Sequence, residues 1–230
     1  MTWPTFSYQG QDLFVVDVLN AQRGGFFLDS GASNGLRGSN TKLLESALGW
    51  RGICIEPNAE MFAELVRNRS CICLDCCLYD KDGTVEFLEA AQVYGGIIDE
   101  YHPFHLDYAR RMASSFVGGD AQVSSTRKQA RTIRSVLVDH GAPSVIDYWS
   151  LDTEGSELAI LRSFPFDEYA FRILTVEHNH LPSREKIRAF LESRGYHRVS
   201  SLGIDDCYVW DHAFSRPMWR SPVWGRRRRG

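Results

Sequence analysis

Acidic side chains cluster at the ends of two apolar segments in the second half of the chain. Three acids follow the apolar segment 145–151 within six residues, and Glu177 and His178 follow a second apolar segment. Carboxylates and imidazoles act as general bases, and carboxylates also bind hard divalent cations. We therefore expect Asp152, Glu154, Glu177 and His178 to form a catalytic base or to bind a divalent cation, with Asp152 as the strongest candidate. The alternative is that these acids cap helices and carry solvated loop charge.

A glycine-containing loop follows the apolar segment 26–28, and an acid follows the next apolar segment. The loop holds Gly31 and Gly35 in a G-x-x-x-G spacing, so it lacks the G-x-G-x-x-G fingerprint of dinucleotide-binding proteins. Glycine lets a ligand approach the backbone closely. Glu56 comes about twenty residues later, where an acid can accept hydrogen bonds from both hydroxyls of a ribose. This combination favours a nucleoside-containing cofactor, and the alternative is that Glu56 caps a helix.

Short apolar segments alternate with helical patterns, which predicts βαβ units and an α/β fold with a parallel sheet. In such a sheet ligands lie outside the carboxyl ends of the strands, which is where the residues above fall. We expect strands at 26–28, 52–56, 71–74, 145–151 and 173–176, and a closing hairpin of 196–200 and 207–210 around Asp205-Asp206. We expect helices at 40–48, 58–66, 156–163 and 184–193, with N-caps that include Asn40, Asn58 and Ser183. Segment 11–19 fits a strand or a helix, and 84–88 fits a strand that pairs beyond a turn.

Residues 89–130 break this alternation and form an insertion before the fourth strand. Such a segment covers a ligand site or is an ordinary surface excursion, and the sequence leaves both open. His102 and His105 are a second candidate source of a base. The aromatic residues Tyr101, Phe104 and Tyr108 either line an acceptor pocket or form the buried stripe of a helix.

Composition and charge exclude several classes of protein. Hydrophobic residues make up 43% of the 230 residues and charged residues 24%, which excludes a mostly disordered chain. No apolar stretch is long enough to span a membrane and the first residues lack a secretory signal, so we expect no membrane span and a cytoplasmic location. Residues 216–230 hold six arginines and no acid, whereas the rest of the chain is acidic. This acidic body disfavours a nucleic acid partner.

Four of the six cysteines, Cys71, Cys73, Cys76 and Cys77, lie close together in the sequence. Their spacing does not match the paired C-x-x-C knuckles of zinc sites. We interpret the segment as a buried strand in which cysteine serves as a small apolar side chain rather than as a metal ligand.

Taken together, these segments resemble the FkbM-type methyltransferases, which use S-adenosyl-L-methionine. The resemblance rests on the combination of residues 11–20, 25–35, 36–41, 49–58, 80–87, 146–157 and 175–179. It implies the class I methyltransferase (Rossmann-like) sheet, with seven mostly parallel strands, an antiparallel last strand and helices on both faces. It also implies that segment 11–19 is a helix.

The resemblance carries a set of cofactor-binding residues onto this sequence. Those implied are Asp29, Gly31, Ala32, Asn34, Gly35, Arg37, Ser39, Asn40, Glu56, Pro57, Asp75, Cys76 and Asp152. The glycine loop would line the methionine part, Glu56 would accept the ribose hydroxyls, and Asp75 and Cys76 would lie near the adenine. Residues 37–40 would hold the carboxylate of the cofactor or shape the start of a helix.

The resemblance also implies the reaction. Methyl transfer from a sulfonium needs alignment of acceptor, methyl group and sulfur, and a hydroxyl acceptor must in addition lose its proton. We expect O-methylation of a sugar, a glycan or a natural-product small molecule, with the acidic cluster as the base or as ligands of a divalent cation. The alternatives are a methyltransferase that acts on a peptide side chain or RNA, and a non-catalytic cofactor-binding module.

The expected organisation is one methyltransferase domain over residues 1–215, followed by a flexible basic and aromatic tail over 216–230. The insertion 89–130 would be the acceptor lid. Lid and tail together would suit a homodimer.

Overall fold

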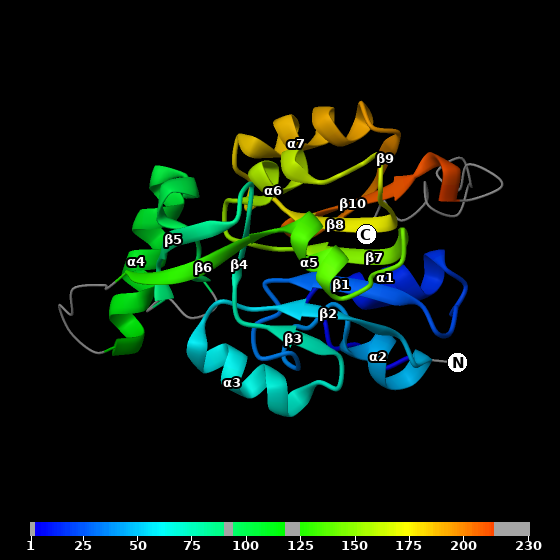
Figure 1. Ribbon diagram of the computed structural model, residues 1–230, viewed down its shortest axis with the longest axis horizontal. Coiled ribbons are helices and arrows are strands. Elements are labelled where there is room, and N and C mark those ends of the chain that lie inside the picture. Colours follow the sequence, from blue (N-terminus) through cyan, green and yellow to red (C-terminus); the bar gives the residue numbers. More distant parts are fainter. Residues whose placement is uncertain (1–2, 90–93, 118–124, 214–230) are drawn as a thin grey trace.

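Seven strands form one sheet in the computed structural model, which describes residues 3–89, 94–117 and 125–213 (Figure 1). The strand order is β3-β2-β1-β7-β8-β10-β9, and neighbours run parallel except β10, which is antiparallel to both β8 and β9. The strands are β1 (Phe26–Ser30), β2 (Arg51–Ile55), β3 (Ile72–Leu74), β7 (Val145–Leu151), β8 (Ala170–Glu177), β9 (Tyr196–Leu202) and β10 (Asp205–Trp210). The expected α/β sheet of seven mostly parallel strands with an antiparallel last strand is confirmed.

Helices cover both faces of this sheet, as expected (Figure 1). On one face lie α1 (Gln11–Val18), α2 (Lys42–Leu48) and α3 (Ala59–Asn68), and on the other lie α5 (Ile133–Asp139), α6 (Glu157–Ser163) and α7 (Ser183–Glu192). Each set packs its apolar side chains on the sheet, for example Leu44 of α2 and Leu161 of α6, both fully buried. Burial of one such side chain stabilises the fold by about 1.5–3 kcal/mol. The sheet is therefore held rigidly between two apolar layers, and its strand ends have fixed positions.

A smaller sheet lies beside the large sheet, and the insertion 89–130 contributes a helix and most of one strand to this part (Figure 1). Strands β4 (Cys77–Tyr79), β6 (Thr126–Thr132) and β5 (Gly83–Phe87) pair in that order, so segment 84–88 pairs beyond its turn, with β6 as its partner. The short helix η2 (Ile98–Glu100) and α4 (Pro103–Val117) follow, and η3 (Asp211–Ala213) ends the described chain. Tyr101 is buried, whereas Phe104 is 81% exposed, so the three aromatic residues expected to share a buried stripe do not.

Three local predictions differ from the structure. Asn40 is not the N-cap of α2, which begins after Thr41; the Asn40 side chain instead donates a hydrogen bond to Ser150 of β7. Asp205 and Asp206 are not a turn, because β10 begins at Asp205 and the chain reverses at Gly203, where φ is +61°. Ser183 is the first residue of α7 rather than its N-cap.

Strand β3 lies at the edge of the sheet and is less buried than expected. Ile72 is 37% exposed, and Cys71 and Cys73 are half-buried. Cys76 and Cys77, which follow β3, are buried, in agreement with their interpretation as small apolar side chains. An edge strand has a neighbour on one side only, which explains the exposure of its first residues.

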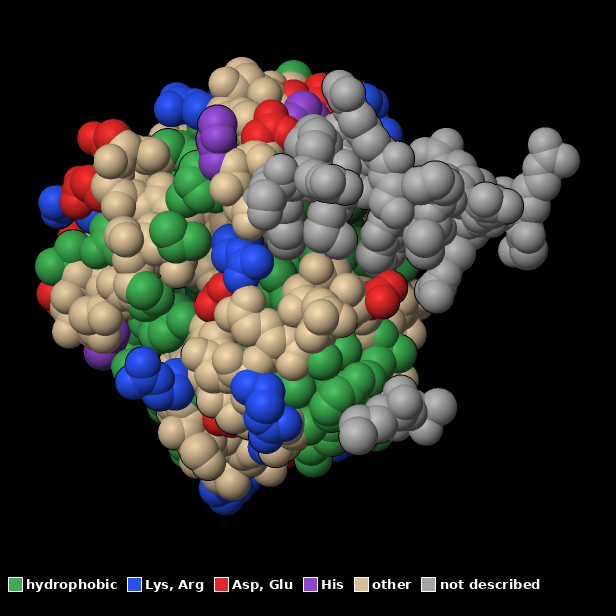
Figure 2. Space-filling view, turned by 90° about the vertical axis from the view of Figure 1, so that its right-hand side faces the viewer, with side chains coloured by type: hydrophobic (Ala, Val, Ile, Leu, Met, Phe, Trp, Pro, Cys, Tyr) green, Lys and Arg blue, Asp and Glu red, His purple; other side chains and the backbone are tan. Residues whose placement is uncertain are grey.

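The molecular surface adds two findings. No helix in the described ranges is long and apolar enough to cross a membrane. On the face shown in Figure 2, the Lys and Arg side chains that the structure describes lie as separate spots rather than as one basic patch. The arginine-rich tail 216–230 lies outside the described residues, as does part of the insertion.

Candidate active site

The register of the sheet places five carboxylates and one glycine in a row at its carboxyl edge. Ser30, the last residue of β1, pairs with Ile55 of β2 and Leu151 of β7, and these in turn pair with Leu74 and Val176. The next residue on each strand therefore lies in the same row. Across the sheet this row reads Asp75, Glu56, Gly31, Asp152, Glu177 and Asp205.

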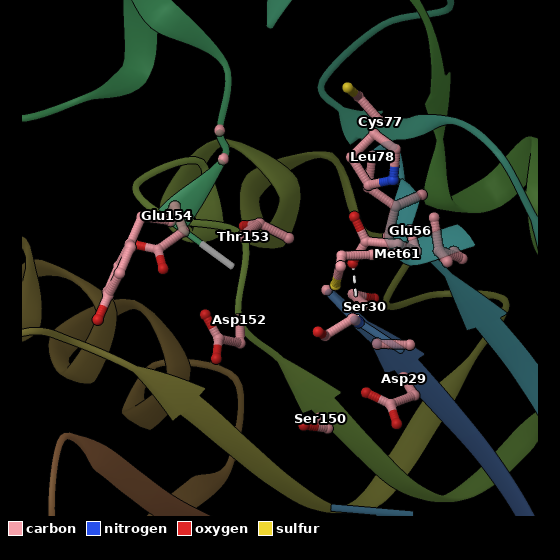
Figure 3. A pocket seen from close by; sticks show the side chains of 18 of the residues that line it. Asp29, Ser30, Glu56, Met61, Cys77, Leu78, Ser150, Asp152, Thr153 and Glu154 are labelled. Atoms are coloured by element: carbon pink, nitrogen blue, oxygen red, sulfur yellow. Dashed lines mark hydrogen bonds between the residues drawn. The ribbon is translucent and has the colours of Figure 1, made fainter. Parts of the chain in front are cut away.

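A cavity of about 550 Å³ opens above the centre of this row (Figure 3). Glu56 lies at one side of it and Glu154 at the other, with Asp152 between them. Gly31 is required here, because a Cβ atom at this position would lie 1.7 Å from the carbonyl oxygen of Asp152 and φ is +82°. The close approach of the β1 loop to the β7 loop forms the floor of the cavity.

The Glu56 carboxylate is fixed by two backbone donors. Ser33 N–H donates to its Oε2 at 2.8 Å, and Asn58 N–H donates to its Oε1 at 2.8 Å. Asn58 also caps α3, because its side chain accepts a hydrogen bond from Met61 N–H, as predicted. Burial raises the pKa of Glu56 to about 7, although both backbone hydrogen bonds lower it. Each carboxylate oxygen keeps a lone pair for a ligand in the cavity, so Glu56 can accept two hydroxyl groups.

Beside Glu56 the cavity wall is mostly apolar. Ile55, Met61, Cys76, Leu78 and Phe87 line this part, and Met61 and Leu78 lie near Glu56 in Figure 3. An apolar wall next to a carboxylate that can accept two hydroxyl groups suits a flat heteroaromatic ring attached to a ribose.

Another part of the cavity lining, which includes Asp29 and Asn40, is polar. Asp29 is buried and accepts a hydrogen bond from Thr41 Oγ1 at 2.5 Å, and burial raises its pKa, opposed by the nearby charge of Arg69. Asn40 lines the cavity, and its buried Oδ1 has no hydrogen-bond partner among the residues that the structure describes. Arg37 also lines the cavity. An unused acceptor and a guanidinium in one cavity suit a ligand that carries both an ammonium group and a carboxylate.

Three carboxylates meet at the far side of the cavity. Oxygen atoms of Asp152, Glu154 and Glu177 all lie within 4.8 Å of one another. Burial raises the pKa of Asp152 and of Glu177, and the negative charges of their neighbours raise both further. The proximity of the two carboxyl groups disfavours the state in which both are ionised.

Glu157, the third acid of this loop, has a structural role. Its Oε1 accepts hydrogen bonds from the backbone N–H groups of Thr153 and Gly155, at 2.8 and 3.1 Å, and from the Thr153 hydroxyl. Glu157 therefore fixes the loop that precedes α6.

The insertion contributes to the same side of the cavity. His105 of α4 lies with its Nε2 2.7 Å from Oε2 of Glu154, and this contact raises the pKa of the imidazole. Glu154 has a φ of +59°, a conformation that non-glycine residues rarely adopt. Gly155 lies so close to Glu100 that a Cβ atom would approach its carbonyl oxygen to 2.8 Å. The insertion is therefore packed tightly on the acidic loop.

Most of the expected cofactor residues line this cavity. They are Asp29, Gly31, Ala32, Asn34, Arg37, Ser39, Asn40, Glu56, Pro57, Cys76 and Asp152. Among the residues described, Gly35 and Asp75 are not part of its lining; Asp75 is instead 4.0 Å from Lys128. Of the expected catalytic residues, Asp152 and Glu154 line the cavity, whereas Glu177 is not in its lining but has a carboxylate oxygen within 4.8 Å of theirs.

His178 faces another environment. Its Nε2 lies 3.9 Å from Asp206, its Nδ1 accepts a hydrogen bond from His180 N–H, and burial lowers its pKa to about 4. Three further residues line the cavity: Tyr8 of the N-terminal segment, Tyr94 of the insertion and Ile204 of the β9–β10 turn. Sequence reasoning did not identify Tyr8 and Ile204.

Comparison with known proteins gives a family. Residues 29–198 match the family model described as Methyltransferase FkbM domain. No curated protein is significantly similar to the chain in sequence. A similar solved structure is the precorrin-6y C5,15-methyltransferase from Geobacter metallireducens GS-15, with 13% identity, a TM-score of 0.39 and coverage of 86% of each chain. Since the family model matches most of its length, the chain belongs to the FkbM methyltransferase domain family.

Proposed function

We propose that the protein is an S-adenosylmethionine-dependent O-methyltransferase whose acceptor is a hydroxyl group of a sugar, a glycan or a natural-product small molecule. The observation that carries this proposal is the arrangement of the cavity. A fixed carboxylate with two free lone pairs, Glu56, lies on one side, and the Asp152–Glu154–Glu177 cluster lies on the other. The first suits a nucleoside and the second suits proton removal.

The residues of the cavity fit each part of the cofactor. Glu56 would accept the ribose hydroxyls, and the apolar wall with Met61 and Leu78 would contact the adenine. Asn40 Oδ1, which has no partner in the described structure, would accept a hydrogen bond from the ammonium group, and Arg37 would hold the carboxylate. When bound, the cofactor supplies a methyl group already activated on a sulfonium.

The chain's own residues then have two tasks. The floor at Gly31 and Asp152 and the wall at Thr153 and Glu154 limit where an acceptor can lie, and so align it. The Asp152–Glu177 pair accepts the hydroxyl proton on whichever oxygen is ionised. The His105 contact holds Glu154 at the cavity wall.

The carboxylate cluster of Asp152, Glu154 and Glu177 also disfavours one of the alternative acceptors, RNA. Its negative charge would repel a polyanion such as RNA at the acceptor side. A divalent cation held by these carboxylates would serve the same end as a base, because it would make the acceptor hydroxyl more acidic.

A calorimetric titration tests the cofactor. We expect S-adenosylmethionine and S-adenosylhomocysteine to bind the wild-type chain with micromolar affinity and NAD not to bind. A screen of hydroxylated small molecules and glycans with labelled methyl donor, with and without a chelator, then tests the acceptor class and the cation. Absence of binding by both adenosyl compounds in a folded sample would refute the proposal.

A further inference from the structure

Three thiols gather on the face of the sheet that is covered by α1, α2 and α3, outside the residues that line the cofactor cavity. Cys54 of β2 is fully buried and pairs in register with Cys73 of β3. Cys71, just before β3, has its sulfur 3.5 Å from that of Cys54. The Cys73 thiol instead points to the carbonyl oxygen of Cys71, at 3.6 Å. The closest pair of thiols among these three is therefore Cys54 and Cys71.

The two sulfurs are close enough to bond after a small movement. A disulfide has an S–S length of about 2.05 Å, so the sulfurs need to approach by about 1.5 Å, which side-chain rotation and a slight shift of an edge strand can supply. Cys71 precedes the edge strand and is half-buried, so it can move more easily than Cys54.

The surroundings favour Cys71 as the more reactive thiol. The hydrogen bond shared with the Cys54 thiol and the charge of Arg69 lower the pKa of the Cys71 thiol, whereas burial raises the pKa of Cys54. The Arg69 side chain is fully buried and is bound to Glu45 at 2.6 Å, which also accepts the Cys71 N–H at 2.8 Å. A fixed guanidinium next to a thiol stabilises the thiolate, which is the nucleophilic form.

Cys71 is also accessible from outside. It lines an open groove of about 820 Å³ at the amino ends of the strands, together with Lys42, Glu45 and Ser70. A small oxidant can therefore reach Cys71 without entering the cofactor cavity.

We propose that Cys54 and Cys71 form a modification site at which hydrogen peroxide produces a reversible disulfide. The Cys71 thiolate attacks one peroxide oxygen, the O–O bond breaks, and Cys71 becomes a sulfenic acid while the other oxygen leaves as water after protonation. The Cys54 sulfur then attacks the Cys71 sulfur, the S–S bond forms, and the hydroxyl group leaves as a second water. Two thiols thus lose two electrons and two protons, and one hydrogen peroxide is reduced to two waters.

The experiment uses the reduced full-length chain treated with one equivalent of hydrogen peroxide. Remaining thiols are then blocked with an alkylating reagent under denaturing conditions, and intact mass and peptide masses are measured. We expect a loss of two mass units before alkylation, two fewer alkylated cysteines, and full reversal by a dithiol reductant. A gain of one oxygen mass without loss of thiol pairs would overturn the proposal.

Single variants identify the pair. Cys71→Ser should react at least about tenfold more slowly and form no disulfide, whereas Cys73→Ser and the control Cys76→Ser should react like the wild type. Disulfide formation that persists in Cys71→Ser, or that is lost in Cys73→Ser, would overturn the assignment. Because Cys54 is buried and its replacement can impair folding, tandem mass spectrometry of the cross-linked wild-type peptides provides the second identification.

Discussion

Replacing Glu56 by glutamine tests the proposed cofactor site most directly. The side chain keeps its size, so the apolar contacts around it stay. The change removes the negative charge and replaces one acceptor oxygen by an NH₂ group, which is a donor. In the wild type, both oxygens accept backbone hydrogen bonds, from Ser33 and Asn58, at 2.8 Å. One of those N–H groups would then face an NH₂ group.

The size of the effect follows from the hydrogen bonds that the variant cannot make. A hydrogen bond to a charged group contributes about 1.5–3 kcal/mol, and Glu56 can make two to a ribose. Glutamine keeps one neutral acceptor, so we expect a loss of about 2–4 kcal/mol, equivalent to about 30- to 1,000-fold weaker binding of S-adenosylhomocysteine.

The same effect should depend on pH. Burial raises the pKa of Glu56 to about 7, and the ionised form is the better acceptor. Binding then requires loss of a proton below pH 7, so wild-type affinity should rise with pH by up to about tenfold per unit and level off above pH 8. The Glu56→Gln variant should show no such rise.

Calorimetry at pH 6 and pH 8.5 measures both quantities, and thermal unfolding verifies that the variant is folded. Asp75→Asn is the matched control, because Asp75 lies next to Glu56 in the same row but outside the cavity lining that the structure describes. We expect its affinity to stay within about threefold of wild type. A folded Glu56→Gln variant that binds within threefold of wild type at pH 8.5 would show the reasoning to be wrong.

Three further variants examine the acceptor side and the scaffold. Asp152→Asn should lower methyl transfer about 100-fold or more, and wild-type turnover together with unchanged cofactor affinity would contradict its role as base. His105→Gln should lower turnover and alter the pH profile of turnover but leave S-adenosylhomocysteine affinity unchanged. The reason is that His105 contacts Glu154, which lies across the cavity from Glu56. A parallel loss of affinity would argue for a structural role of His105. Arg69→Met should lower the free energy of unfolding by about 3–5 kcal/mol in urea titrations, because it leaves buried acids without their cation, and a change below 1 kcal/mol would contradict this.

The strands of the large sheet could be predicted from the sequence because they are short apolar segments that end at polar residues. Strand β7 has the predicted bounds, Val145–Leu151, and Asp152 follows it directly, as expected. Glu56, expected as the last residue of its strand, lies one residue beyond β2. A parallel sheet brings the carboxyl ends of its strands to one edge, so these ends alone predicted that Glu56 and Asp152 lie at the same edge of the sheet.

The same reasoning could not find features that depend on partners distant in sequence. Strand β6 (Thr126–Thr132) has almost no apolar residues, and it is a strand because β4 and β5 pair with it on both sides. Arg69 ends α3 and carries no sequence signal, yet its guanidinium joins Glu45, Ser39 and Thr41 in the interior. Such contacts follow from the packing of whole elements rather than from local pattern.

The turn wrongly predicted at Asp205 concealed one carboxylate of the row at the edge of the sheet. Its neighbourhood reads as a turn, but β10 begins at Asp205, which pairs with Glu177 and accepts a hydrogen bond from Gln11 at 2.6 Å. Burial raises its pKa to about 6. The negative charge beside Asp152 is therefore larger than the sequence indicated, and Asp205 belongs to the row through its register.

This concentration of buried carboxylates has a consequence for the proposed reaction. Carboxylates that repel one another in a low-dielectric site raise the free energy of the empty protein, and a positive charge nearby relieves that repulsion. The methyl donor carries a sulfonium charge, whereas the demethylated product is neutral at sulfur. The cluster of Asp152, Glu154 and Glu177 would thus attract the donor more strongly than the product. The arrangement that supplies a base for the acceptor would, by the same electrostatics, favour exchange of product for a new donor.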